Sequence, residues 1–196
     1  MGGAWRARRA RATWAGVLLA VPVLWSCAAA SPLTPVEGGF RNQRRGYQLG
    51  APSSASWQGD EVEGSLLAFR DRSGATRMTF SSRCGEPITR PDLLARHLRI
   101  GIPANVVREA GPVEIGSLAG WQQVFDVDAP RGAVRMKTVT FPVNGCALDW
   151  VLIARDADGF EAAEPDFDAW WRTLSVESLS APESTTAGSA SAEPAP

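Results

Sequence analysis

Two short runs of apolar residues near position 75 have the pattern of paired strands. Residues 66–70 form an apolar run, and residues 75–81 alternate, with Met78 and Phe80 on one side and polar residues on the other. Alternation with a period of two is typical of a strand that buries one face. The polar residues 71–74 separate the two runs. The pattern therefore predicts a β-hairpin formed by these two runs.

Four longer strands are predicted in the second half of the chain, over residues 106–115, 120–127, 133–141 and 146–154. The last two are joined by Asn144-Gly145, which is among the strongest short hairpin signals. An initial strand is predicted at residues 47–49. Because strands joined by hairpins run antiparallel, we expect an antiparallel sheet of six to seven strands.

Two segments change to the helical period. In residues 91–100, Leu94 and Leu98 lie four positions apart, and Pro91 suits the first helical position. Residues 165–174 have large apolar side chains at positions i, i+3, i+4 and i+7, namely Phe167, Trp170, Trp171 and Leu174. Acidic residues at the start of this second helix stabilise it, because they lie at the positive end of the helix dipole. With two helices flanking the sheet, the predicted fold class is α+β.

The segments outside this middle part have no apolar period. Residues 28–44 contain several prolines and glycines, and they are predicted to be a flexible tether. Residues 177–196 consist almost wholly of Ser, Ala, Glu, Pro, Thr and Gly. Such a tail can bury too little apolar surface to offset its ordering entropy, so we expect it to be disordered. The predicted folded domain spans residues 45–176.

The N-terminus has the pattern of an export signal. Four arginines, Arg6, Arg8, Arg9 and Arg11, precede an apolar run over residues 15–25. A run of 11 residues is too short for a membrane-spanning helix, which needs about 20. A basic start, a short apolar run and small residues after it are typical of a secretory signal peptide.

The end of the apolar run resembles the bacterial lipobox, in the residues Leu24, Trp25, Ser26 and Cys27. The resemblance implies that residues 1–26 are removed and that the Cys27 sulfur carries a lipid anchor. Trp25 departs from the motif, which has a small residue there. Ala28, in place of an Asp, favours the outer membrane. The alternative is cleavage after residues 28–30, which would release a soluble secreted domain.

The amino-acid composition argues against two classes of function, nucleic-acid binding and zinc binding. The chain has 196 residues, with 20 Lys+Arg against 21 Asp+Glu, one His and three Cys. A near-zero net charge gives no support for a nucleic-acid binder. One histidine and three cysteines exclude most zinc sites built from several His or Cys ligands. We therefore expect no nucleic-acid partner and no cofactor.

Cys84 and Cys146 form an even pair once Cys27 is assigned to the anchor. In an exported protein an even pair predicts a disulfide, because the periplasm is oxidising. Two free buried thiols remain an alternative. A catalytic thiol has little support, since the chain has no Cys-x-x-Cys and only one histidine, His97.

The other polar motifs have simpler structural interpretations. The acidic stretch 156–168 lacks the third alternating acid of a calcium loop, because Gly159 directly follows Asp158. We expect a solvated loop followed by a helix start, with calcium as the alternative. The arginines are expected to be a solvated surface, with a patch for anionic lipid or peptidoglycan as the alternative: Arg70, Arg72, Arg77, Arg83, Arg90, Arg96 and Arg99.

A resemblance to a known group of proteins covers residues 45–176. It is carried by Tyr47-Gln48-Leu49-Gly50, Trp57, Phe69, Cys84-Gly85, the run 145–150 and Phe167. These residues are similar to those of uncharacterised bacterial lipoproteins with a PsbP-like α/β/α sandwich. The resemblance implies a non-enzymatic binding or assembly module, anchored in the envelope and with a protein partner. An envelope enzyme built from scattered Asp, Arg and Tyr47 remains the alternative.

Overall fold

The computed structural model describes residues 33–85, 90–102, 105–130 and 132–177. The expected signal peptide, Cys27 and the segment 178–196 lie outside the described residues. No helix in the described part of the chain is long and apolar enough to cross a membrane.

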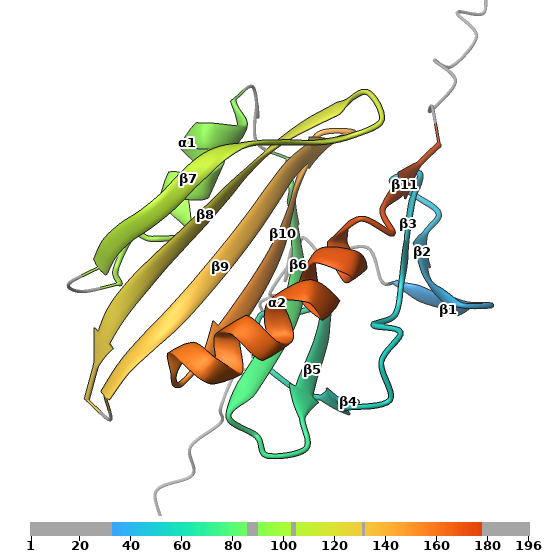
Figure 1. The fold of residues 1–196 in the computed structure, drawn as a ribbon. Helices are drawn as coiled ribbons and strands as arrows, with labels where there is room; N and C mark the ends of the chain where they lie inside the picture. The colour runs from blue at the N-terminus through green and yellow to red at the C-terminus, as the bar shows by residue number, and fades with distance from the viewer. Residues whose placement is uncertain (1–32, 86–89, 103–104, 131, 178–196) are drawn as a thin grey trace, which may run out of the picture.

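The main sheet is antiparallel and has seven strands: β4 (Trp57–Asp60), β5 (Leu67–Asp71), β6 (Thr76–Cys84), β7 (Asn105–Ile115), β8 (Leu118–Ala129), β9 (Gly132–Val143) and β10 (Cys146–Ala154). Their order is β4-β5-β6-β10-β9-β8-β7, so β4 and β7 are the edge strands (Figure 1). The predicted β5–β6 hairpin and the four later strands are confirmed. The predicted fold class, an α+β protein with an antiparallel sheet of six to seven strands, is also confirmed.

One long connection places β10 in the middle of this sheet. Strand β6 pairs with β10, and helix α1 (Pro91–His97) and strands β7 to β9 lie between them in sequence. In this pairing Phe80 lies opposite Trp150, and Cys84 lies opposite Cys146. The turn signals predicted the hairpins, but this pairing joins residues too far apart for a local signal.

Helix α2 (Ala157–Trp171) covers one face of the main sheet (Figure 1). The core under it is aromatic. The Trp150 ring lies 4.7 Å from that of Phe80 and 6.2 Å from that of Phe141, and Phe141 lies 5.8 Å from Trp171. All four side chains are almost fully buried. The predicted apolar face of the second helix is therefore the main contact between the helix and the sheet.

Helix α1 covers the opposite face. It packs against β8 and β9, and Leu94 and Ala95 are its buried residues. The Gln123 side chain donates a hydrogen bond of 2.7 Å to the Ala95 carbonyl. In the sheet register Gln123 and Val151 are aligned across β9, so their side chains lie on the same face. Because Val151 follows Trp150 in β10, that face is the one opposite to Trp150. The two helices thus give three layers, an α/β/α sandwich.

A small second sheet corrects the expected tether. Its strands are β1 (Thr34–Val36), β2 (Gly39–Asn42), β3 (Tyr47–Gly50) and β11 (Ser175–Val176), in the order β1-β2-β3-β11. The tether was expected to extend to residue 44, but residues 34–42 form a hairpin that pairs with β3. A Cβ on Gly39 would lie 2.2 Å from the Leu49 carbonyl oxygen, so the glycine permits this close pairing. A glycine needed for pairing looks like a loop residue in sequence.

Helix α2 begins earlier than predicted, at Ala157 rather than at Pro165. The Asp156 carboxylate caps the helix by accepting a hydrogen bond of 2.7 Å from the Gly159 amide. An acidic cap of this kind satisfies one of the free amides of the first turn. Most of the expected acidic loop is therefore helical, and Pro165 lies inside the helix.

Candidate functional site

Cys84 and Cys146 are joined in a disulfide at one end of the main sheet. Cys84 is the last residue of β6 and Cys146 is the first of β10, and the two are direct cross-strand partners. The Cys146 side chain is fully buried, whereas Cys84 is exposed. The bond closes a long connection, since the two cysteines are 62 residues apart in sequence.

Two turns meet beside the disulfide. The Gly85 amide donates to the Gly145 carbonyl over 3.2 Å, next to the cysteine pair. The Asn144 side chain donates a 2.7 Å hydrogen bond to the carbonyl of Arg45, in the β2–β3 turn. The disulfide, the β9–β10 turn and the β2–β3 turn therefore form one connected end of the domain.

Asp149 is the most deeply buried carboxylate of the described residues, with no exposed side-chain surface. Its Oδ1 accepts a hydrogen bond of 2.8 Å from the Thr140 hydroxyl, and the Arg83 guanidinium lies 3.4 Å from its Oδ2. Burial raises the pKa of the Asp149 carboxyl, although Thr140 and Arg83 act in the opposite direction. Thr140 and Arg83 hold Asp149 within the sheet, and we assign it a structural role.

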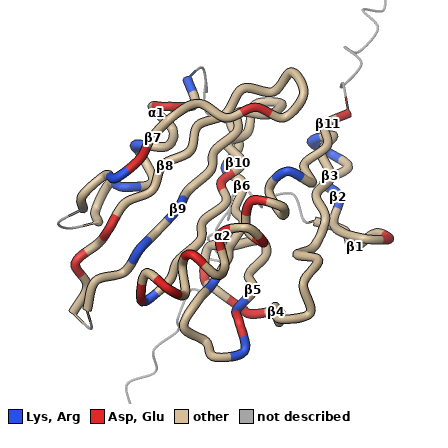
Figure 2. Tube along the Cα trace, viewed as in Figure 1, with Lys and Arg blue, Asp and Glu red and all other residues tan. Residues whose placement is uncertain are grey.

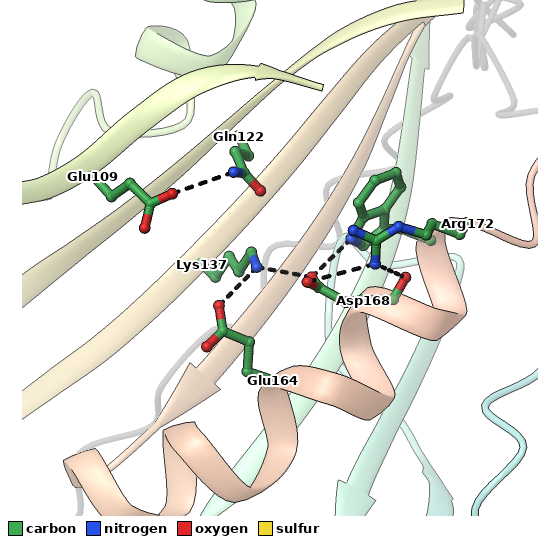
Figure 3. Close-up of polar contacts among 7 residues, drawn as sticks. Glu109, Gln122, Lys137, Glu164, Asp168 and Arg172 are labelled. Carbon is green, nitrogen blue, oxygen red and sulfur yellow. Dashed lines mark hydrogen bonds and ion pairs between the residues drawn. The ribbon is translucent and has the colours of Figure 1, made fainter. Parts of the chain in front are cut away.

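Lys137 connects the sheet to the acidic side of α2 (Figure 3). Its side chain is only 5% exposed, and its Nζ lies 2.7 Å from a Glu164 oxygen and 2.8 Å from an Asp168 oxygen. Asp168 also accepts a hydrogen bond of 3.0 Å from the Trp171 indole. The sequence interpretation missed this role of Lys137. The available signal was the single lysine of the chain, standing at a core position of a strand.

The acidic stretch does not assemble a cation site. Figure 2 shows acidic residues along α2, and four of the acidic residues in the stretch 156–168 are bound by protein groups: Asp156, Glu164, Asp166 and Asp168. Asp156 caps the helix, and Asp166 accepts a hydrogen bond of 2.8 Å from the Trp57 indole. Across the described ranges, no group of three His, Cys, Asp or Glu side chains is placed to hold a metal ion.

Several of the other candidate residues have ordinary structural surroundings. His97 ends α1. Arg77 and Arg90 form ion pairs with Asp60 and Asp92, over 3.0 Å and 2.8 Å. The expected surface arginines are thus partly neutralised by neighbouring carboxylates.

A pocket opens between β2 and the β4–β5 edge of the main sheet. Its volume is about 660 Å³, within the usual range of small-molecule sites. The lining combines apolar side chains, including Phe40 and Phe69, with the carboxylates of Asp60, Glu61 and Glu63. The lining residues include no histidine, cysteine or lysine, and in the described part of the chain their carboxylates are not grouped to hold a metal ion.

Large exposed apolar side chains occur in a short stretch of sequence that includes α1 and the start of β7. Within the described part of the chain, the large apolar residues classed as exposed are Leu93 (42%), Ile100 (76%), Val106 (66%) and Val107 (40%). They fall within a short stretch of sequence that includes the open edge strand β7. We call these four residues the α1–β7 patch. Val106 and Val107 are consecutive in β7, so they point to opposite faces of the sheet at its open edge. Exposed apolar residues beside an open edge strand are a candidate contact surface.

Comparison with solved structures identifies the class of fold. The cyanobacterial PsbP protein CyanoP of Synechocystis sp. PCC 6803 superposes with a TM-score of 0.52 at 14% identity, over 79% of this chain and 99% of that chain. The chain therefore has a PsbP-like fold. No protein-family model and no curated protein matches the sequence.

Two further solved structures are similar at lower scores. One is PA94 of Pseudomonas aeruginosa, described as a protein of unknown function and putative regulator; it has a TM-score of 0.45 at 15% identity, over 74% of this chain and 98% of that chain. The other is LpqN of Mycobacterium tuberculosis, described as involved in cell envelope biogenesis. It has a TM-score of 0.44 at 14% identity, over 63% of this chain and 78% of that chain.

Proposed function

We propose that the chain is a lipoprotein of the bacterial cell envelope and acts as a non-enzymatic binding or assembly module. The observation that carries the proposal is the N-terminal sequence, in which four arginines and a short apolar run lead to Ser26-Cys27. In this proposal residues 1–26 are the signal peptide, Cys27 carries the lipid, and the protein is held at the outer membrane. Two or three acyl chains anchor a protein stably, whereas one does not.

The disulfide supports a location in the cell envelope, and the exposed apolar residues support a binding function. A disulfide between Cys84 and Cys146 suits an oxidising compartment outside the cytoplasm. The α1–β7 patch favours a binding module, because exposed apolar side chains beside an open edge strand offer a surface to a partner. The Asp149 carboxyl, whose pKa is raised by burial, is bound by Thr140 and Arg83 within the sheet, which favours a structural role over a catalytic one.

The anchor is tested by metabolic labelling with palmitate. We expect the wild-type chain to be labelled and Cys27→Ala to be unlabelled, because the thioether is made on the Cys27 sulfur. The control Ser26→Ala keeps a small residue before the cysteine and should retain the label. An unlabelled wild-type chain that begins at Ser31 would contradict the lipoprotein and favour a secreted domain.

The binding function is tested by photo-cross-linking in intact cells. A photoreactive amino acid at Val106, which is 66% exposed in the α1–β7 patch, is expected to give a discrete protein adduct. The matched control is Glu114, which is exposed in the same strand but lies outside the patch. Adducts that are identical at both positions, or absent from both, would argue against the patch as the binding surface.

A further inference from the structure

Two adjacent arginines in the β2–β3 turn have no carboxylate partner among the residues that the structure describes. Arg44 is exposed and Arg45 is half-buried. Within the described residues neither forms an ion pair, and Arg45 Nε has no hydrogen-bond partner. The neighbouring Arg41 differs, because it is paired with Glu177. The turn therefore carries two positive charges that the rest of the described domain does not neutralise.

Hydrogen bonds with Asn42 and Asn144 hold the backbone of this turn. The Arg45 amide donates to both the side-chain and main-chain oxygens of Asn42, over 3.0 Å and 3.2 Å. Asn42 is buried and donates a 3.2 Å hydrogen bond to the Tyr47 hydroxyl. The Arg45 carbonyl is held by Asn144, beside the disulfide. Arg44 and Arg45 thus lie in a turn whose backbone is already ordered, which lowers the conformational entropy lost when they bind a partner.

The turn lies where the described chain begins. In the β1–β2 pairing Thr34 lies opposite Arg41, so Leu33 enters the domain at the same end as the turn. Five residues, 28–32, separate Leu33 from Cys27 in sequence. Six extended steps of about 3.5 Å span at most about 21 Å. A lipid on Cys27 would therefore hold Arg44 and Arg45 close to the bilayer surface.

We propose that Arg44 and Arg45 bind the anionic phospholipid headgroups of the membrane that carries the Cys27 anchor. The proposal rests on the proposed lipid anchor and adds an orientation, with the disulfide end of the domain facing the membrane. Arginine suits this role because its planar guanidinium binds phosphate oxygens with two parallel hydrogen bonds. An acidic protein and peptidoglycan carboxylates are the other possible occupants, and the experiment separates them from lipid.

The expected size of the effect follows from surface electrostatics. A basic side chain near an anionic leaflet contributes about 1 kcal/mol, which corresponds to about fivefold in population. Two such arginines together raise the ratio of docked to undocked domain about thirtyfold. Salt weakens this attraction, because the screening length falls to about 3 Å at 1 M.

The test is hydrogen exchange on the protein extracted from its own membrane and reconstituted by its own anchor into vesicles. One set of vesicles is phosphatidylcholine alone, and the other also contains phosphatidylglycerol. We expect exchange in residues 42–46 to slow several-fold, up to about thirtyfold, on the anionic vesicles only. The slowing should disappear at high salt and in the double variant Arg44→Gln/Arg45→Gln.

The matched control is Arg70→Gln/Arg72→Gln, which removes two exposed arginines from the β5–β6 hairpin and should keep the protection. Equal exchange on both vesicles, or unchanged protection in Arg44→Gln/Arg45→Gln, would overturn the proposal. Slowing in the α1–β7 patch instead of the turn would also overturn it. If the protein takes up palmitate but its turn is not protected, the headgroup contact of Arg44 and Arg45 is refuted and the Cys27 anchor is not. If the protein carries no palmitate, it is added to the same vesicles from solution, and protection of the turn then refutes only the anchor.

Discussion

Replacing Trp150 by Ala is expected to lower the free energy of unfolding by about 3–5 kcal/mol. Trp150 is fully buried in the centre of β10, with Phe80 and Phe141 packed against its ring. Truncation removes the largest side chain of this contact and leaves a cavity that the sheet cannot close. Domains of this size have total stabilities of about 5–15 kcal/mol, so the variant should lose a large part of its stability. Urea unfolding followed by circular dichroism measures the change.

Trp150→Phe is the matched control for this substitution. It keeps an aromatic ring and removes the indole Nε1, which is buried without a hydrogen-bond partner among the described residues. We expect a cost below about 1.5 kcal/mol, since the lost ring volume is partly offset by removal of an unpaired donor. If Trp150→Ala were as stable as Trp150→Phe, the aromatic core would not be the main source of stability.

Reduction of the Cys84–Cys146 disulfide is expected to cost about 4 kcal/mol. The bond closes a connection of 62 residues, and a long loop restricts the unfolded chain strongly. The β6–β10 pairing itself brings the two cysteines together, because they are direct partners in its register. Urea unfolding with and without a phosphine reductant measures the difference.

Cys84→Ser provides the control for the reductant. Its side chain is exposed, so serine introduces no buried hydroxyl at this position. We expect the variant to match the reduced wild type and to be insensitive to reductant. Two thiols that react with an alkylating agent in the native exported protein would show that the disulfide does not form there.

Trp150→Ala and loss of the disulfide both affect the β6–β10 strand pair, which local sequence signals do not predict. The β6–β10 pairing brings Phe80 to Trp150 and Cys84 to Cys146. The same pairing holds the disulfide end, where the β2–β3 turn meets Asn144. Loss of the disulfide should therefore loosen the end of the domain that carries the proposed membrane contact before it affects β7, which lies three strands away from β10 in the sheet.

Much of the fold could be predicted from local pattern. Met78 and Phe80 alternate with polar residues and are both fully buried in β6. The helical spacing of Phe167, Trp170 and Trp171 correctly identifies the buried face of α2. These predictions succeed because burial on one face leaves a period that short windows of sequence preserve.

The candidate site could be predicted only in part. Cys84 and Cys146 are recognisable as a pair by counting, but Lys137 and Asp149 look like polar residues misplaced in strands. Their partners, Glu164 and Arg83, lie on other elements. A sequence pattern shows that a charge is buried but does not show which distant group compensates it.

By itself, the sequence determined the export-like N-terminus, the apolar faces of the strands and helices, and the even pair of cysteines beyond Cys27. These properties belong to single residues or to neighbours in the chain. Only the tertiary structure decided that residues 34–42 join the fold and that α2 begins at the Asp156 cap. It also decided that Arg44 and Arg45 form no ion pair within the described residues, at the end of the domain where the described chain begins. The physical reason is that pairing and charge compensation depend on which distant segments meet.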